Sequence, residues 1–110
     1  MNFINRTPHL VKVINADGTE REFPPSGEVA RVSMITNCQR TVDGIVVCYQ
    51  EPGPTTGLPA REEGVMCIVS TIVQTANPRR SDLVRPDTGS DCERDEKGNI
   101  LAVRRFIGAL

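Results

Sequence analysis

The chain has 110 residues, of which 38% are hydrophobic, and its formal net charge is −1. This length predicts a single compact domain over residues 1–110, and the small net charge excludes a general attraction to duplex nucleic acid or to anionic lipid. Its aromatic residues are three Phe and one Tyr, with no Trp, so an aliphatic core is expected.

Targeting signals are not visible in the sequence. The first ten residues lack a cationic start followed by an apolar stretch, which a secretory signal requires. The longest apolar runs, residues 45–49 and 65–69, are far too short to span a membrane. We therefore expect a soluble cytoplasmic protein.

The only histidine lies in the segment Asn5-Arg6-Thr7-Pro8-His9. Pro8 restricts Thr7 to extended geometry, and the Asn5 and Thr7 side chains are suited to hydrogen bonds with nearby backbone. One interpretation is a structured turn leading into the first strand, with His9 partly buried. The alternative is that His9 contacts a bound ligand.

A hairpin is predicted next, with strands at 10–14 and 19–23 joined by a turn that ends in Asp17-Gly18. Residues 24–27, with sequence PPSG, predict a second turn, in which the backbone N–H groups of Ser26 and Gly27 are candidates for an anion-binding nest. Residues 29–34 alternate with the period of two that is typical of a strand.

The apolar run at 45–49 predicts a strand buried on both faces. Residues 51–64 contain three prolines and three glycines and almost no apolar side chains. Long loops of this kind are often functional, and the two interpretations are a solvated connection or a lid over a binding site.

The run at 65–69 predicts another strand, and Ser70 is suited to cap a helix over 71–76 that ends before Pro78. One long strand over 65–74 is the alternative, but its length is unusual. A turn at 95–98 then precedes an alternating strand over 100–107.

Residues 77–87 contain three arginines and two aspartates. In one interpretation this is a solvated turn in which Asp82 pairs internally with an arginine. In the other, Arg79 or Arg80 forms a fork for an anion, oriented by Asp82 or Ser81.

Catalytic and metal chemistry have little support in the sequence. The four cysteines form no C-x-x-C pair, and a lone histidine lacks the partners that catalysis needs. We predict that Cys48 and Cys67 are buried in strands, and that Cys38 and Cys92 are exposed thiols; the expected compartment gives no reason for a disulfide. No cofactor and no metal are expected.

Five short motifs occur in a recognisable order: Asn5 to His9, the PPSG turn at 24–27, Gly57-Leu58-Pro59, the strand end at Ser70, and the RSDLV segment at 80–84. Together they resemble a family of small proteins encoded by bacteriophages and actinomycetes, with Arg6 in place of an aliphatic residue. The resemblance implies a phage or mobile-element context, hence the host cytoplasm and a role against host defence, but no activity.

The sequence thus predicts a β-rich α+β fold: a mostly antiparallel sheet or small barrel of about six or seven short strands, with one short helix near 70–77. We expect a non-catalytic protein that binds a small anionic, nucleotide-like ligand. The predicted ligand-binding residues are His9, Ser26, Arg79, Arg80 and Asp82. A protein–protein inhibitor of a host defence enzyme is the main alternative; a small hydrolase and a minor structural phage protein are others. Self-association stays open.

Overall fold

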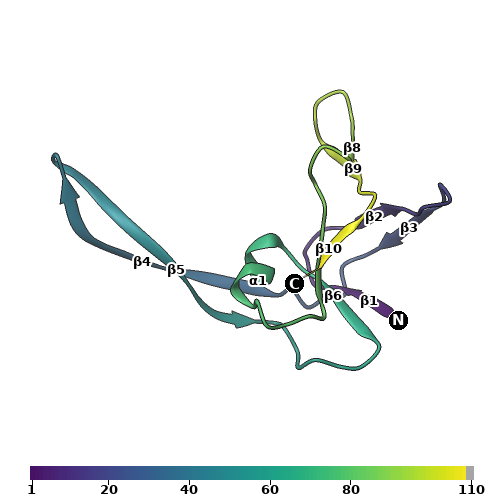
Figure 1. The fold of residues 1–110 in the computed structure, drawn as a ribbon, viewed down its shortest axis with the longest axis horizontal. Helices are drawn as coiled ribbons and strands as arrows, with labels where there is room; N and C mark the ends of the chain where they lie inside the picture. The colour runs from purple at the N-terminus through teal and green to yellow at the C-terminus, as the bar shows by residue number, and fades with distance from the viewer. Residues whose placement is uncertain (109–110) are drawn as a thin grey trace.

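The computed structural model describes residues 1–108, which form ten strands and one helix (Figure 1). The elements in chain order are β1 (Asn2–Asn5), β2 (Val11–Ile14), β3 (Glu20–Phe23), β4 (Arg31–Val42), β5 (Ile45–Thr56), β6 (Val65–Ile68), α1 (Thr71–Ala76), β7 (Leu83–Pro86), β8 (Glu93–Arg94), β9 (Ile100–Ala102) and β10 (Phe106–Gly108). The predicted β-rich α+β class is confirmed, although the described strands are more numerous than the six or seven expected.

A central four-stranded sheet has the order β1-β6-β7-β10. β6 pairs in parallel with β1 on one side and with β7 on the other, and β10 closes the sheet antiparallel to β7. The remaining strands form three two-stranded antiparallel hairpins: β2-β3, β4-β5 and β8-β9. The sheet is therefore mixed, with local hairpins attached to it.

Both faces of the central sheet are covered. Successive side chains of a strand point to opposite faces, so Cys67 and Ile68 of β6 belong to two different clusters. Ile68 packs with the apolar side chains of β2 and with an aromatic group on one face. Cys67 packs on the other face with Val73 of α1 and Leu83 of β7. The aromatic group is formed by Phe3, Phe23 and Phe106, whose ring centroids lie 5.3–6.0 Å apart.

Helix α1 forms where the sequence predicted it. The Ser70 side chain accepts a hydrogen bond from the Val73 backbone N–H at 3.4 Å, which is the expected N-cap. Asn77 ends the helix directly before Pro78. The alternative of one long strand over 65–74 is therefore wrong.

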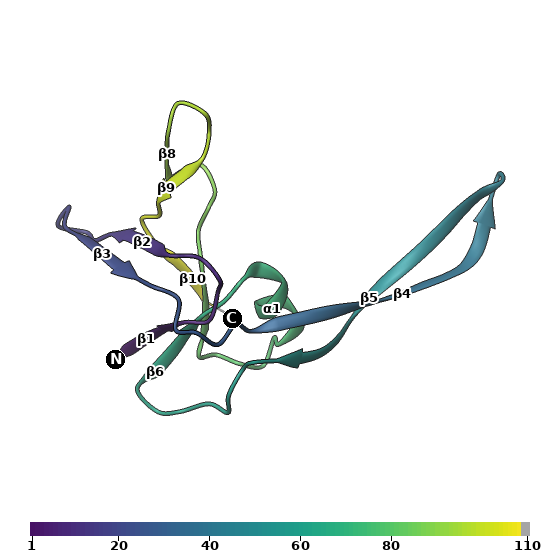
Figure 2. The ribbon, with the colours of Figure 1, turned by 180° about the vertical axis from the view of Figure 1, so that it is seen from behind.

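The β4-β5 hairpin projects from the rest of the molecule as a long arm (Figures 1 and 2). Its tip is a two-residue turn in which Asp43 has φ 50° and Gly44 has φ 80°, the positive values that a type I′ turn requires. The radius of gyration is 16.8 Å, against about 13 Å for a compact domain of this length. The arm makes the molecule elongated.

The arm corrects three predictions. The run at 45–49 is not buried on both faces, because the arm has no layer packed on it and Ile45 is 67% exposed. Residues 51–56 are not a loop, since β5 runs to Thr56. Cys48 is not a core residue and Cys38 is not a thiol, because the two form a disulfide across the arm.

Several predictions from the sequence are confirmed. The β2-β3 and β8-β9 hairpins form around the predicted turns, and Cys67 is buried. Cys92 is a thiol, but it is half-buried rather than exposed as predicted. The predicted strand over 100–107 is divided into β9 and β10. Because disulfides are rare in reducing compartments, a cytoplasmic location stays a prediction. Among residues 1–108, no helix is long and apolar enough to cross a membrane.

Candidate ligand-binding pocket

The buried Asn5 side chain organises the N-terminal turn. Its amide Nδ2 donates hydrogen bonds to the carbonyl oxygens of His9 and Phe23, both at 2.7 Å. Its Oδ1 accepts from the backbone N–H and the hydroxyl of Thr7, at 2.9 and 2.6 Å. The predicted structured turn is therefore present, and one amide holds it in position beside β3.

This turn forms one wall of a cavity with a volume of about 630 Å³. The other walls come from the start of β4, the start of α1, the end of β7, and β9. Buried aliphatic side chains of both core clusters, including Val11, Val69 and Val73, contribute to the lining. The lining also includes exposed aliphatic side chains, namely Leu10, Ile72, Ile100 and Leu101. The cavity is therefore largely apolar and open to solvent.

The charged side chains that line the cavity are all basic: Arg6, Lys12, Arg31 and Arg85, together with His9. Lys12 lies 3.6 and 3.7 Å from the carboxylates of Glu20 and Glu22, outside the lining. Within residues 1–108, neither Arg31 nor Arg85 has a side-chain hydrogen bond or a carboxylate within ion-pair distance. Since no carboxylate lines the cavity, its potential favours an anion.

Arg6 is less available than these two. Its Nη1 donates to Glu28 at 2.8 Å, and its Nε is buried with no hydrogen-bond partner among the described residues. An unpaired buried donor costs about 1–3 kcal/mol. Arg6 therefore lines the wall as one half of an ion pair, with one buried donor left unpaired.

Of the five predicted site residues, only His9 lines this cavity. Its side chain is exposed rather than partly buried. Ser26 does not form the predicted nest, because its backbone N–H donates to the Asn5 carbonyl at 3.0 Å and its hydroxyl lies 3.4 Å from the Glu28 carbonyl oxygen. Through this backbone hydrogen bond, Ser26 connects the segment after β3 to Asn5 at the end of β1.

Arg80 and Asp82 form an internal ion pair. Arg80 donates to both carboxylate oxygens of Asp82, from Nε at 2.8 Å and from Nη2 at 2.7 Å, and Nη2 also reaches the Pro59 carbonyl at 2.9 Å. The hydrogen bonds from Arg80 hold the pKa of Asp82 below its ordinary value. The pair fixes the segment after β5 to the turn before β7, which matches the structural interpretation of residues 77–87.

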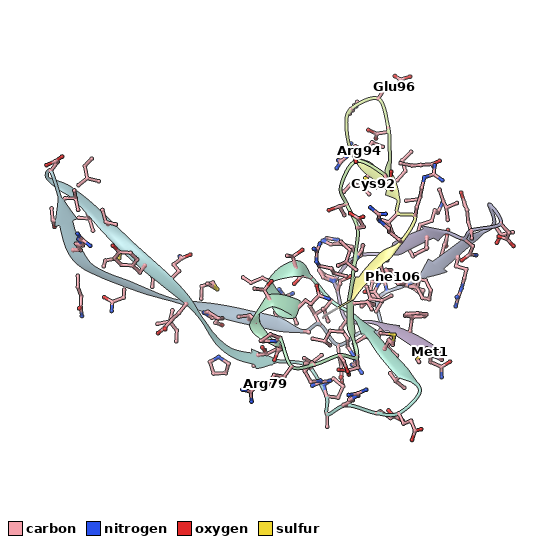
Figure 3. All side chains as sticks on the ribbon, in the orientation of Figure 1. Met1, Arg79, Cys92, Arg94, Glu96 and Phe106 are labelled. Atoms are coloured by element: carbon pink, nitrogen blue, oxygen red, sulfur yellow. A yellow bond between two sulfur atoms is a disulfide. The ribbon has the colours of Figure 1, made fainter. Side chains whose placement is uncertain are left out.

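Arg79 is exposed at the edge of the molecule near α1 (Figure 3). Neither it nor Arg80 nor Asp82 lines the cavity. The structure therefore does not bring residues 79–82 to His9, and the predicted grouping of these side chains is not formed.

Arg31 and Arg85 were not among the site residues predicted from the sequence. Arg85 lies in the same arginine-rich segment as Arg79 and Arg80. It belongs to β7 and lines the cavity, whereas Arg79 and Arg80 precede that strand and do not. Arg31 opens β4 in an alternating segment. No motif distinguishes either residue, since their shared position depends on how β4 and β7 meet in space.

The described residues contain no group of three or more His, Cys, Asp or Glu side chains placed to hold a metal ion. The cavity contains guanidinium donors, one imidazole and an apolar contact surface. This combination suits a small ligand that has an anionic group and an apolar part. No family model matches the chain, and comparisons with curated proteins and with solved structures also gave no match.

Proposed function

We propose that this protein binds a small anionic, nucleotide-like ligand in the cavity lined by His9, Arg31 and Arg85. The observation that carries the proposal is the composition of the walls: all charged lining residues are basic, and the rest of the surface is mainly apolar. The volume lies in the range of about 300–1,000 Å³ that small-molecule sites occupy.

Each part of such a ligand has a matching surface. Among the described residues, Arg31 and Arg85 have no carboxylate within ion-pair distance, and forked guanidinium donors suit phosphate oxygens. The exposed side chains of Ile72, Ile100 and Leu101 supply the apolar surface that a base or sugar face would cover.

Binding without turnover is the simplest role for this set of side chains. His9 carries the chain's one imidazole, and it lines the cavity. It has no side-chain hydrogen bond to a carboxylate or a nucleophile within residues 1–108. A general base needs a partner to orient it and a nucleophile to activate.

The biological setting is proposed from the sequence motifs. The resemblance to small phage and actinomycete proteins supports a mobile-element context for such a binder. Sequestration of a nucleotide signal of host defence is then the corresponding role, and it requires no chemical step by this chain.

Thermal unfolding tests the binding. Adenosine and guanosine monophosphates, 3′,5′-cyclic AMP and a cyclic dinucleotide are titrated against the protein, with adenosine and inorganic phosphate as the two half-ligands. A ligand that binds the folded state raises the melting temperature with its concentration. We expect a nucleotide to exceed both half-ligands, because it occupies the cationic and the apolar surface together.

Arg85→Met and Arg31→Met remove the charge but keep an apolar side chain. Each variant should need at least ten times more nucleotide than the wild type for the same rise in melting temperature. Arg79→Met is the matched control, since it removes an exposed arginine outside the cavity. The proposal fails if no nucleotide stabilises the protein, or if the control weakens binding as much as the cavity variants. Conversion of a nucleotide to product would refute the non-catalytic assignment.

A further inference from the structure

The molecule exposes more surface than a compact monomer of its size. A chain of 12.1 kDa should expose about 6,000 Å², whereas this one exposes 7666 Å². The excess of roughly 1,600 Å² per chain accompanies the β4-β5 arm, which projects into solvent in both views (Figures 1 and 2). An isolated two-stranded hairpin is at best marginally stable in water, so a surface that covers the arm is expected.

One face of the arm is mainly apolar. Residues directly opposite each other in a hairpin share a face, as do residues two apart along a regular strand. The pairs Ile35–Glu51, Asn37–Tyr49, Arg40–Val47 and Val42–Ile45 therefore lie on one side, which we call the Tyr49 face. The hydrogen bond from Arg40 Nη1 to the Tyr49 hydroxyl, at 3.3 Å, agrees with this assignment.

The opposite side of the arm is already occupied by internal bonds. It carries the Cys38–Cys48 disulfide and the hydrogen bond from Gln50 Nε2 to the Thr36 hydroxyl at 3.1 Å. Val46 also lies on this side, because it neighbours Ile45 on the same strand. The two sides of the arm therefore differ in character.

The geometry points to a homodimer in which the Tyr49 faces of two copies pack against each other, with the arms antiparallel about a two-fold axis at Tyr49. Arg40 lies one pair from Tyr49 toward the tip, and Glu51 lies one pair from Tyr49 toward the base. In this arrangement Arg40 of each copy meets Glu51 of the other. The Tyr49 face thus complements itself in charge as well as in apolar surface.

A second copy fits this surface better than a partner of strong charge. A two-fold interface uses the same patch on both chains and must be self-complementary, and the Tyr49 face carries one cation and one anion. The formal net charge of the chain is −1, so two copies repel each other little. Burial of half of the excess area on each chain, for the one side of the arm that the dimer covers, would amount to about 1,600 Å², the standard size of a protein–protein interface.

The oligomeric state tests this inference by sedimentation velocity at micromolar concentration, on the full chain with its disulfide intact. We expect a dimer. Ile45→Ser should raise the dissociation constant at least tenfold, whereas Val46→Ser should leave it within twofold; these neighbouring side chains are 67% and 62% exposed but lie on opposite sides.

Charge reversal provides the decisive comparison. Arg40→Glu and Glu51→Arg should each weaken the dimer, and the double variant should restore it, because the exchanged charges again meet across the axis. A monomeric wild-type protein, equal effects of Ile45→Ser and Val46→Ser, or a double variant weaker than both single ones would overturn the proposal. The ligand cavity lies outside the arm face, so this outcome is independent of nucleotide binding.

Discussion

Replacement of Asn5 by Ala tests how the N-terminal turn is held. The substitution removes four hydrogen bonds, two donated to the carbonyl oxygens of His9 and Phe23 and two accepted from Thr7. Each such bond contributes about 1 kcal/mol net, and buried groups left unpaired cost more. Allowing for water to reach the half-buried Thr7 and the exposed His9, we expect a loss of about 2–4 kcal/mol in the free energy of unfolding.

Urea unfolding followed by far-UV circular dichroism measures this loss, provided that the slope of the transition is unchanged. Asn15→Ala is the matched control, because its side chain makes one exposed hydrogen bond, from Nδ2 to the Thr19 hydroxyl at 3.0 Å. The control should lose less than about 1 kcal/mol. If Asn5→Ala costs no more than Asn15→Ala, the turn does not depend on this amide and the account of the pocket wall is incorrect.

Three further predictions concern charge and cross-linking. Asp82→Asn should reduce the loss of folding free energy on acidification. Because the pKa of Asp82 is lowered in the folded state, its pairing with Arg80 stabilises the fold above pH ~4, and this stabilisation is lost as the pH falls through the folded-state pKa. The urea midpoints of wild type and variant should therefore converge at low pH. Reduction of the Cys38–Cys48 disulfide should destabilise the arm by about 2.7 kcal/mol from loop closure. Hydrogen exchange should then accelerate in β4 and β5 alone, and uniform acceleration would show that the arm does not open separately from the central sheet. Arg6→Met should lower the free energy of unfolding by less than about 1 kcal/mol, or raise it, since it removes a buried unpaired donor. A loss above about 2 kcal/mol, measured by thermal unfolding, would show that the Arg6 Nε has a hydrogen-bond partner.

Local chemistry in the sequence determined the elements that depend on neighbouring residues. The turn at Gly18, the helix cap at Ser70 and the turn at Gly98 were all predictable, because the hydrogen bonds and positive φ angles they need come from residues within a few positions. The β-rich class followed from alternation and from β-branched composition. The burial of Cys67 was predictable because it lies within the apolar run at 65–69.

The tertiary structure alone decided which strands meet and which surfaces stay open. Parallel pairing of β1 with β6 joins residues more than sixty positions apart, and no local pattern encodes such a partner. The run at 45–49 looked like a buried strand because apolar content does not distinguish a core from an uncovered arm. His9, Arg31 and Arg85 come together, and Arg79 to Asp82 do not, because backbone pairing of distant strands, rather than the spacing of charges along the chain, places each guanidinium group in space.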